Sequence, residues 1–196
     1  MKPTVSPETE KPPVQVAESW PRQPQPPPRP AREIVTFAGP FTRKGHVRTH
    51  IFGQYKPEAS LFRGERTKRS GDDYYHQGVD VLAPRGTIVI APADGVVVKA
   101  GMWDPRGYGI AILVRVAAGA NPLYVLYAHL DQVLVGEGAR VRRGQPIART
   151  GKSGNAARLP RSEEHVHIEV RTQEVVGPGL AGRLDPLPYF PNIAPP

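Results

Sequence analysis

Short apolar runs separated by turn signals dominate the chain after residue 34. Gly- and Pro-containing segments such as Pro84-Arg85-Gly86 and Gly136-Glu137-Gly138 interrupt the pattern repeatedly, and no apolar stripe with helical spacing and useful length is present there. Closely spaced apolar runs with such turns are typical of an antiparallel, mostly β domain. The expected strands are Ile88–Ile90, Gly95–Ala100, Ile110–Val116, Leu123–Ala128, Pro146–Thr150 and Val166–Val170.

Two segments lack this pattern. Ten of the 24 prolines fall within the first 30 positions, and the run QPQPPPRP favours an extended polyproline conformation. We therefore expect residues 1–33 to be a Pro-rich disordered tail or linker and residues 34–196 to form one domain. Residues 55–75 are polar and irregular, and they are expected to be a long loop that leads to a site.

Composition restricts the chemistry that is available. The 196-residue chain has no cysteine, so a metal site must be built from His, Asp and Glu. The formal charge of +8 suits polyanionic partners such as nucleic acid, anionic membrane or a teichoic-acid-bearing wall. The arginines are spread through loops instead of alternating with aromatic residues, which disfavours nucleic acid. No transmembrane segment is expected. The first residues lack the apolar core of a signal peptide, so either export uses another route or the front of the chain is trimmed.

Four of the six histidines have settings that suggest chemistry. His76 and Asp80 are four positions apart, so on an extended strand their side chains would share one face, with Gly78 leaving room for an ion. His165 and His167 would likewise share one face of a strand whose other face is apolar. His129 ends the apolar run Leu126-Tyr127-Ala128. His46 and His50 have no such setting and are not predicted to take part.

Zinc suits this set of side chains. Catalytic zinc usually takes three protein ligands and keeps a fourth position open. Two neutral imidazoles and one carboxylate leave a positive centre that lowers the pKa of a bound water. The other two histidines would then serve proton transfer and oxyanion stabilisation. Chemistry alone leaves open which three residues bind the metal.

The motifs resemble those of the lysostaphin/LytM-type peptidoglycan zinc metalloendopeptidases, from about Phe52 to Pro186. Matching pieces are His76–Asp80, Ala83–Thr87, Ala91–Val97, Gly107–Gly109, Tyr127–Leu130, Val141–Gly151, Ser153–Asn155 and His165–Val170. The resemblance implies a duplicated-hybrid-motif fold: a two-sheet antiparallel β sandwich, barrel-sandwich-hybrid-like, with a metal site in a groove. It also implies that His76, Asp80 and His167 bind Zn²⁺ and that His129 and His165 form the catalytic pair. Glu169, on the same face as His167, is expected to be its orienting partner or a structural residue.

The implied function is hydrolysis of peptide bonds in peptidoglycan stem or cross-bridge peptides. The enzyme would act as a monomer at the bacterial cell wall, in the periplasm or outside the cell, with anionic wall polymers as further partners. Which peptide bond is cut stays open. In residues 156–164 the chain departs from the family's short Gly/Ser-rich link, and this segment should line the groove. Its Glu163 and Glu164 either attract an amino group of a stem peptide or are solvated.

Two alternatives use other features of the chain. A non-catalytic wall-binding or hydrolase-activating module on the same fold would have lost metal ligands, whereas this chain keeps all of them. Gly136–Gln145 also resembles the turn of biotinyl or lipoyl carrier domains. Neither Lys99 nor Lys152 lies in a carrier motif, and the four histidines would be unexplained.

Overall fold

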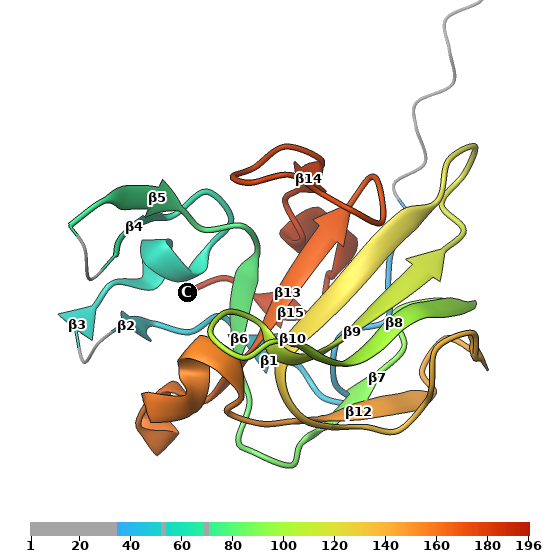
Figure 1. Cartoon of the computed structure of the whole chain (residues 1–196), viewed down its shortest axis with the longest axis horizontal. Coiled ribbons are helices and arrows are strands. Elements are labelled where there is room, and N and C mark those ends of the chain that lie inside the picture. Colours follow the sequence, from blue (N-terminus) through green and yellow to red (C-terminus); the bar gives the residue numbers. More distant parts are fainter. Residues whose placement is uncertain (1–34, 52–53, 69–70) are drawn as a thin grey trace, which may run out of the picture. The chain divides into compact units, whose positions relative to one another are not determined.

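The computed structural model describes residues 35–51, 54–68 and 71–196 (Figure 1). The predicted tail, residues 1–33, lies outside the described residues, so the domain boundary stays a prediction. In the described part, strands account for nearly all regular structure. They are β1 (Gly45–His46), β2 (His50–Ile51), β3 (Gln54–Tyr55), β4 (Glu65–Thr67), β5 (Asp73–Tyr75), β6 (Val79–Leu82), β7 (Ile88–Ile90), β8 (Gly95–Asp104), β9 (Gly109–Val116), β10 (Leu123–Val133), β11 (Arg140–Val141), β12 (Pro146–Thr150), β13 (His165–Arg171), β14 (Arg183–Leu184) and β15 (Ile193–Ala194).

Four short 3₁₀ helices complete the described elements. They are η1 (Pro57–Ser60), η2 (Gly154–Arg158), η3 (Arg161–Glu163) and η4 (Leu187–Tyr189). Within residues 35–51, 54–68 and 71–196, no helix has the length and apolar character to cross a membrane.

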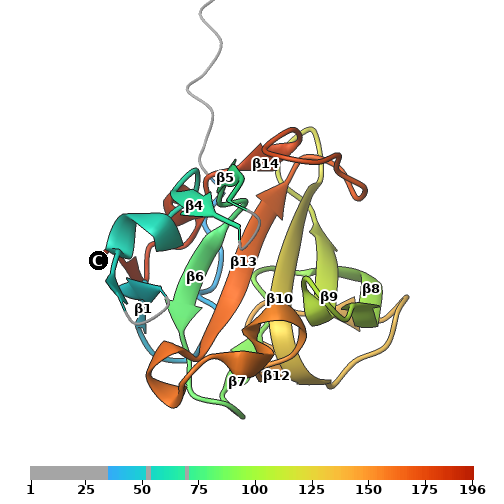
Figure 2. The same ribbon diagram turned by 60° about the vertical axis from the view of Figure 1, so that its left-hand side comes forward.

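The main sheet has nine strands, all paired antiparallel. Its path runs β11-β8-β9-β10-β12-β7, and β13 branches from β10 to pair with β6 and β14 as well. The first part of β10 pairs with β9 and β13, and after a register shift its end pairs with β12. A β-bulge bends a strand in this way. β10 therefore carries the hydrogen-bonded network from the β6-β13-β10-β9-β8 layer toward β12 and β7 (Figure 2). The mostly β, antiparallel fold predicted from the sequence is confirmed.

The core lies between these strands. Val89 of β7, Ile147 of β12 and Ile168 of β13 are fully buried in one hydrophobic cluster. Strand β13 is buried at every position because both of its faces are covered. Val166, Ile168 and Val170 form the apolar face, as predicted, and the opposite face carries His165, His167, Glu169 and Arg171. That polar face forms the floor of the site.

Residues 55–75 differ from the predicted long loop. They contain η1 and the hairpin of β4 and β5, in which Thr67 Oγ1 donates a hydrogen bond to Asp73 Oδ1 at 2.9 Å. The side chains of β5 are exposed, so the hairpin has no apolar alternation for a sequence pattern to detect. Main-chain pairing and polar cross-strand contacts hold it instead. Two of the six predicted strands, Gly95–Ala100 and Leu123–Ala128, continue further than expected, to Asp104 and Val133.

Candidate metal centre

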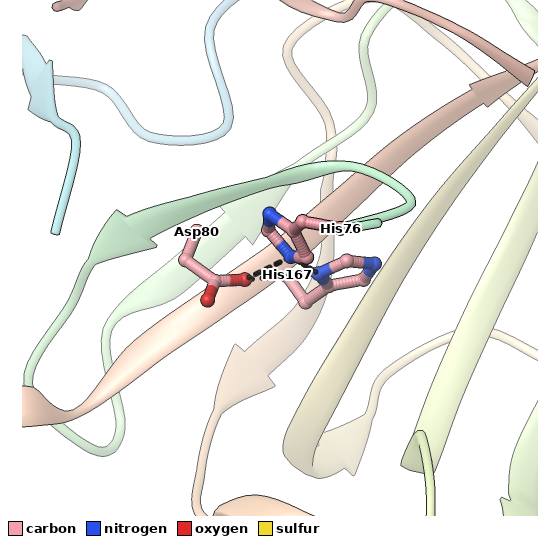
Figure 3. A group of neighbouring side chains, drawn as sticks. All are labelled: His76, Asp80 and His167. Carbon is pink, nitrogen blue, oxygen red and sulfur yellow. Dashed lines mark hydrogen bonds and ion pairs between the residues drawn. The ribbon is translucent and has the colours of Figure 1, made fainter. Parts of the chain in front are cut away.

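The three predicted metal ligands converge on one point (Figure 3). His76 follows β5, Asp80 lies in β6, and His167 lies directly opposite Asp80 in the register of β13 with β6. His76 Nε2 is 3.0 Å from His167 Nδ1 and 3.2 Å from Asp80 Oδ1, and His167 Nδ1 is 2.9 Å from the same oxygen. All three residues are buried. The structure thus brings together the residues that the sequence grouped.

The way in which His76 and Asp80 reach this point differs from the prediction. They do not share one strand face, because His76 precedes the bend at Gln77 and Gly78 and only Asp80 belongs to β6. Gly78 serves a close approach to β13: an added Cβ would lie 2.1 Å from the Ile168 carbonyl oxygen and 2.9 Å from His167 Cε1. Glycine is therefore required there by the backbone and by the ligand ring beside it.

Hydrogen bonds on the far side of each imidazole fix which nitrogen carries the proton. His76 Nδ1 donates to the Leu61 carbonyl oxygen at 2.9 Å, and His167 Nε2 donates to Glu169 Oε1 at 3.2 Å. In their neutral forms the two rings present lone pairs at His76 Nε2 and His167 Nδ1. Together with Asp80 Oδ1, these atoms would repel one another at about 3 Å without a cation or proton among them. Two imidazole nitrogens and one carboxylate oxygen are a ligand set that fits Zn²⁺.

The tendency to bind a proton differs among the three ligand residues. Burial lowers the pKa of His76 to about 4, although Asp80 opposes this. Burial would raise the pKa of Asp80, but His165, His76 and Arg66 together hold it well below its ordinary value. The pKa of His167 is raised: burial would lower it, but hydrogen bonds to Asp80 and Glu169 outweigh burial. A proton and a metal ion thus compete for His167.

Two arginines hold the outer oxygen of Asp80. Arg66 Nη2 lies 2.6 Å from Asp80 Oδ2, and Arg48 Nη1 lies 3.5 Å from it. Arg48 also pairs with Glu163 of η3. These contacts occupy Oδ2 and leave Oδ1 directed at the two imidazoles. Neither arginine was predicted, because nothing in the sequence around them signals a site.

Of the two alternatives expected for Glu163 and Glu164, the solvated one is wrong. Their exposed fractions are 2% and 8%, so neither is solvated. Glu163 pairs with Arg48, and Glu164 Oε2 accepts a hydrogen bond from the Arg85 backbone N–H at 2.9 Å. Both carboxylates are engaged inside the protein because a buried charge requires a partner. The segment does line the groove, through Leu159.

Glu169 contacts His167 in the way that an orienting partner would. Its Oε2 accepts hydrogen bonds from Arg171 Nε and Arg183 Nε, both at 2.8 Å, while Oε1 accepts from Tyr108 Oη and His167 Nε2. Glu169 is fully buried, and burial would raise its pKa, but His167 and the two arginines lower it. The carboxylate therefore stays charged and fixes the plane of the His167 ring.

Tyr108 was missed as a functional residue, although Gly107-Tyr108-Gly109 was among the matching motifs. Its hydroxyl contacts both Glu169 and Gln77. Burial raises the pKa of Tyr108 to about 12, and the negative charge of Glu169 adds to this effect. Arg171 and Arg183 were also missed. Their partner Glu169 is identifiable only after the strand is folded.

The two predicted catalytic histidines lie beside the cluster. His129 sits at the register shift between β10 and β9 with φ of 60°, a left-handed conformation that is uncommon outside glycine and is found at functional sites. Its Nδ1 donates to the Ser153 carbonyl oxygen at 3.2 Å, and His165 Nδ1 donates to the Glu163 carbonyl oxygen at 2.9 Å. The two ring centroids are 5.1 Å apart. Burial lowers the pKa of both, so each is neutral with an unprotonated Nε2.

These groups line one cavity of about 640 Å³, to which His76, His129, His165, His167, Arg66 and Tyr108 contribute. A pocket of this size accepts an extended peptide segment, and its neutral imidazoles stand next to the ligand cluster. His46, which was not predicted to take part, lies exposed on β1 and does not line the cavity. The arrangement can hold a divalent cation and transfer a proton beside it.

The model of peptidase family M23 matches residues 74–178, which is more than half of the chain. The matched range contains the ligand cluster and both neighbouring histidines. The chain therefore belongs to peptidase family M23, which confirms the resemblance to the lysostaphin/LytM-type enzymes.

Curated relatives include an enzyme and an activator. The chain is 40% identical over 96 residues to the DD-carboxypeptidase/endopeptidase Mpg of Neisseria meningitidis serogroup B, covering 49% of this chain and 20% of that protein. It is 35% identical over 118 residues to the murein hydrolase activator NlpD of Escherichia coli, covering 60% of this chain and 26% of that protein. The chain thus spans only about a fifth to a quarter of the length of these relatives.

Solved structures show the same fold. The catalytic domain of lysostaphin from Staphylococcus simulans aligns with a TM-score of 0.50 and 28% identity, over 62% of this chain and 80% of that one. A zinc containing peptidase from Vibrio cholerae aligns with a TM-score of 0.54 and 25% identity, over 76% of this chain and 39% of that one.

Proposed function

We propose that this protein is a zinc-dependent metalloendopeptidase that hydrolyses peptide bonds in peptidoglycan stem or cross-bridge peptides. The observation that carries the proposal is the convergence of the ligand atoms of His76, Asp80 and His167 beside a cavity that His129 and His165 also line. Membership of peptidase family M23 supports peptidase chemistry. The similarity to the murein hydrolase activator NlpD supports the cell wall as the place of action, in the periplasm or outside the cell, and we propose that the enzyme acts there as a monomer.

In this proposal His76, Asp80 and His167 hold the metal. A bound Zn²⁺ would supply a Lewis acid that polarises a scissile carbonyl and activates water. His129 and His165 supply the proton transfers, because each has an unprotonated Nε2 at the cavity. One ring accepts a proton from the attacking water at Nε2, and the protonated ring then forms a hydrogen bond to the developing oxyanion or gives the proton to the leaving amine. The backbone carbonyls bonded to each Nδ1 hold the rings in position.

The second candidate is a non-catalytic module that activates other wall hydrolases. The similarity to NlpD favours it, since that relative is an activator. A purely regulatory domain would have no need of the complete ligand set or of two histidines held in one tautomer each. These features favour the enzyme.

The test combines metal content with digestion. Purified protein is analysed for zinc and is incubated with peptidoglycan of several cross-link types, with and without a chelator, and released fragments are identified by mass spectrometry. We expect one zinc per chain and cleavage that the chelator abolishes. Bound zinc without cleavage of any wall type would reject the enzyme and leave the activator.

A further inference from the structure

A second cavity, of about 520 Å³, is formed by the strand ends far from the metal centre. The start of β8, the end of β9 and strand β11 contribute to it, and the buried side chains of Val116 and Val141 give it an apolar floor. Three arginines line it: Arg115, Arg140 and Arg142. We call it the arginine cavity.

The three guanidinium groups have no partner among the residues that the structure describes. All three side chains are exposed, and none forms an ion pair or a side-chain hydrogen bond within ranges 35–51, 54–68 and 71–196. Asp94 is the single carboxylate that lines the cavity, and its Oδ1 accepts a hydrogen bond from the Arg143 backbone N–H at 2.8 Å. Three positive charges and one negative charge leave the lining with a net charge of +2.

We propose that the arginine cavity binds phosphate groups of a linear anionic polymer. Guanidinium groups match the oxygens of a phosphate with pairs of parallel hydrogen bonds and are weakly hydrated, so convergent arginines favour this ligand. The apolar floor accommodates the carbon skeleton between successive phosphates. A polymer is required because a single exposed ion pair contributes only about 0–1 kcal/mol. Neighbouring phosphates on one chain can rebind before the polymer escapes.

The position of the cavity separates it from the chemistry. Pro122 lines the arginine cavity immediately before β10 begins at Leu123, whereas His129 lies toward the opposite end of that strand. The six residue-to-residue steps of extended strand from Leu123 to His129 span about 20 Å. A polymer can therefore be held there while a peptide occupies the metal-centre cavity. The assignment of this polymer to a bacterial wall rests on the proposed function, whereas the phosphate site itself does not.

The test replaces Arg115, Arg140 and Arg142 together by Gln. The matched control replaces Arg43, Lys44 and Lys56 by Gln, which removes the same charge from exposed side chains that line neither cavity. Binding is measured to inorganic polyphosphate of defined length, and to wall sacculi before and after chemical removal of their phosphodiester polymers. We expect the cavity variant to bind polyphosphate and untreated sacculi at least about tenfold more weakly than the parent, since three ion pairs are lost. The control should lose about twofold, through long-range charge alone.

Several outcomes would overturn the proposal. Equal losses in the two variants would show that only net charge matters, and equal binding to treated and untreated sacculi would exclude a phosphate polymer. Binding to anionic phospholipid vesicles, without binding to polyphosphate, would assign the cavity to a membrane surface instead. Cleavage of short soluble stem peptides should be unchanged in both variants. If the parent binds polyphosphate but cleaves no wall material, the phosphate site is supported and the proposed function fails.

Discussion

Arginines do opposite things in two regions of this molecule. At the metal centre, Arg48, Arg66, Arg171 and Arg183 each pair with a buried or nearly buried carboxylate. At the arginine cavity, Arg115, Arg140 and Arg142 line a hollow and have no side-chain partner in the described part of the chain. Arginine thus neutralises buried carboxylates at the metal centre, whereas at the arginine cavity its positive charge is exposed to solvent.

The difference shows why net charge is a poor guide to function here. A carboxylate taken out of water needs compensation, and the arginines around Asp80 and Glu169 provide it. Those positive charges are cancelled where they stand and cannot attract a partner. The unpaired arginines at the other end of β8 and β9 contribute to the field that a polyanion meets. The overall charge of +8 mixes both kinds.

The largest effect is expected from removing the carboxylate of Asp80, which pairs with two of the arginines at the metal centre. Asp80→Ala removes one ligand and leaves Arg66 and Arg48 facing each other without their shared acceptor. We expect loss of bound metal and of cleavage. Thermal unfolding should report a loss of about 3–5 kcal/mol, the usual cost of breaking a buried ion pair. The control is Asp131→Ala, which breaks the exposed pair with Arg85. It should leave metal content, cleavage and thermal stability unchanged. An Asp80→Ala protein with full zinc content would refute the ligand role.

A second variant separates the metal from proton transfer. His129 lines the same cavity, and its Nδ1 donates a hydrogen bond to the Ser153 carbonyl oxygen, outside the ligand cluster and the arginine pairs. His129→Ala should therefore keep zinc and the arginine pairs while cleavage falls by about 10²–10⁴-fold, the usual worth of a general acid–base group. Zinc content and turnover are measured on one preparation. Loss of the metal would mean that His129 is a ligand and that the division of roles is wrong.

A third variant weakens the arginine–carboxylate pairs around Glu169 without removing a metal ligand. Glu169→Gln keeps the size of the side chain but removes the charge that holds Arg171, Arg183 and the His167 ring. Loss of such an orienting partner typically lowers metal affinity by about 10–100-fold. Competition with a chromophoric chelator measures the affinity directly. Glu174→Gln, an exposed neighbour, should leave it unchanged. Equal zinc affinity in the two variants would contradict an orienting role for Glu169.

The sequence predicted those parts of the site whose residues lie close together in motifs or on one strand. His165, His167 and Glu169 share a face because strand periodicity requires it, and the apolar face of the same strand marked it as buried. The sequence also predicted that His76 and Asp80 lie together. In the structure a bend at Gly78, and not one continuous strand, brings them together. Apolar alternation likewise located the strands that build the core.

The remaining parts depend on contacts that no local pattern encodes. Arg48 and Glu163 are 115 positions apart, and they meet only because β13 places η3 beside the segment that precedes β2. The sequence therefore did not indicate that Glu163 is buried. The β4–β5 hairpin was missed because its strands are short and polar. Its register places Arg66 opposite Tyr74, and Arg66 reaches Asp80. Buried charge was thus the least predictable feature, since each partner is found only by folding.

The smallest effect should come from Glu163, which is connected to the ligand Asp80 only through Arg48. Glu163→Gln retains the volume of the side chain and one acceptor for Arg48, but exchanges a hydrogen bond between two charged groups for one in which only Arg48 is charged, a difference of about 1 kcal/mol. If the weaker hydrogen bond to residue 163 also weakens the contact of Arg48 with Asp80 Oδ2, zinc affinity should fall by about fivefold. Cleavage at saturating zinc should stay near the parent value. Ser162→Ala, an exposed neighbour in η3, is the control. Lower thermal stability with unchanged zinc affinity would instead show that Glu163 supports the fold and that Arg66 alone holds Asp80.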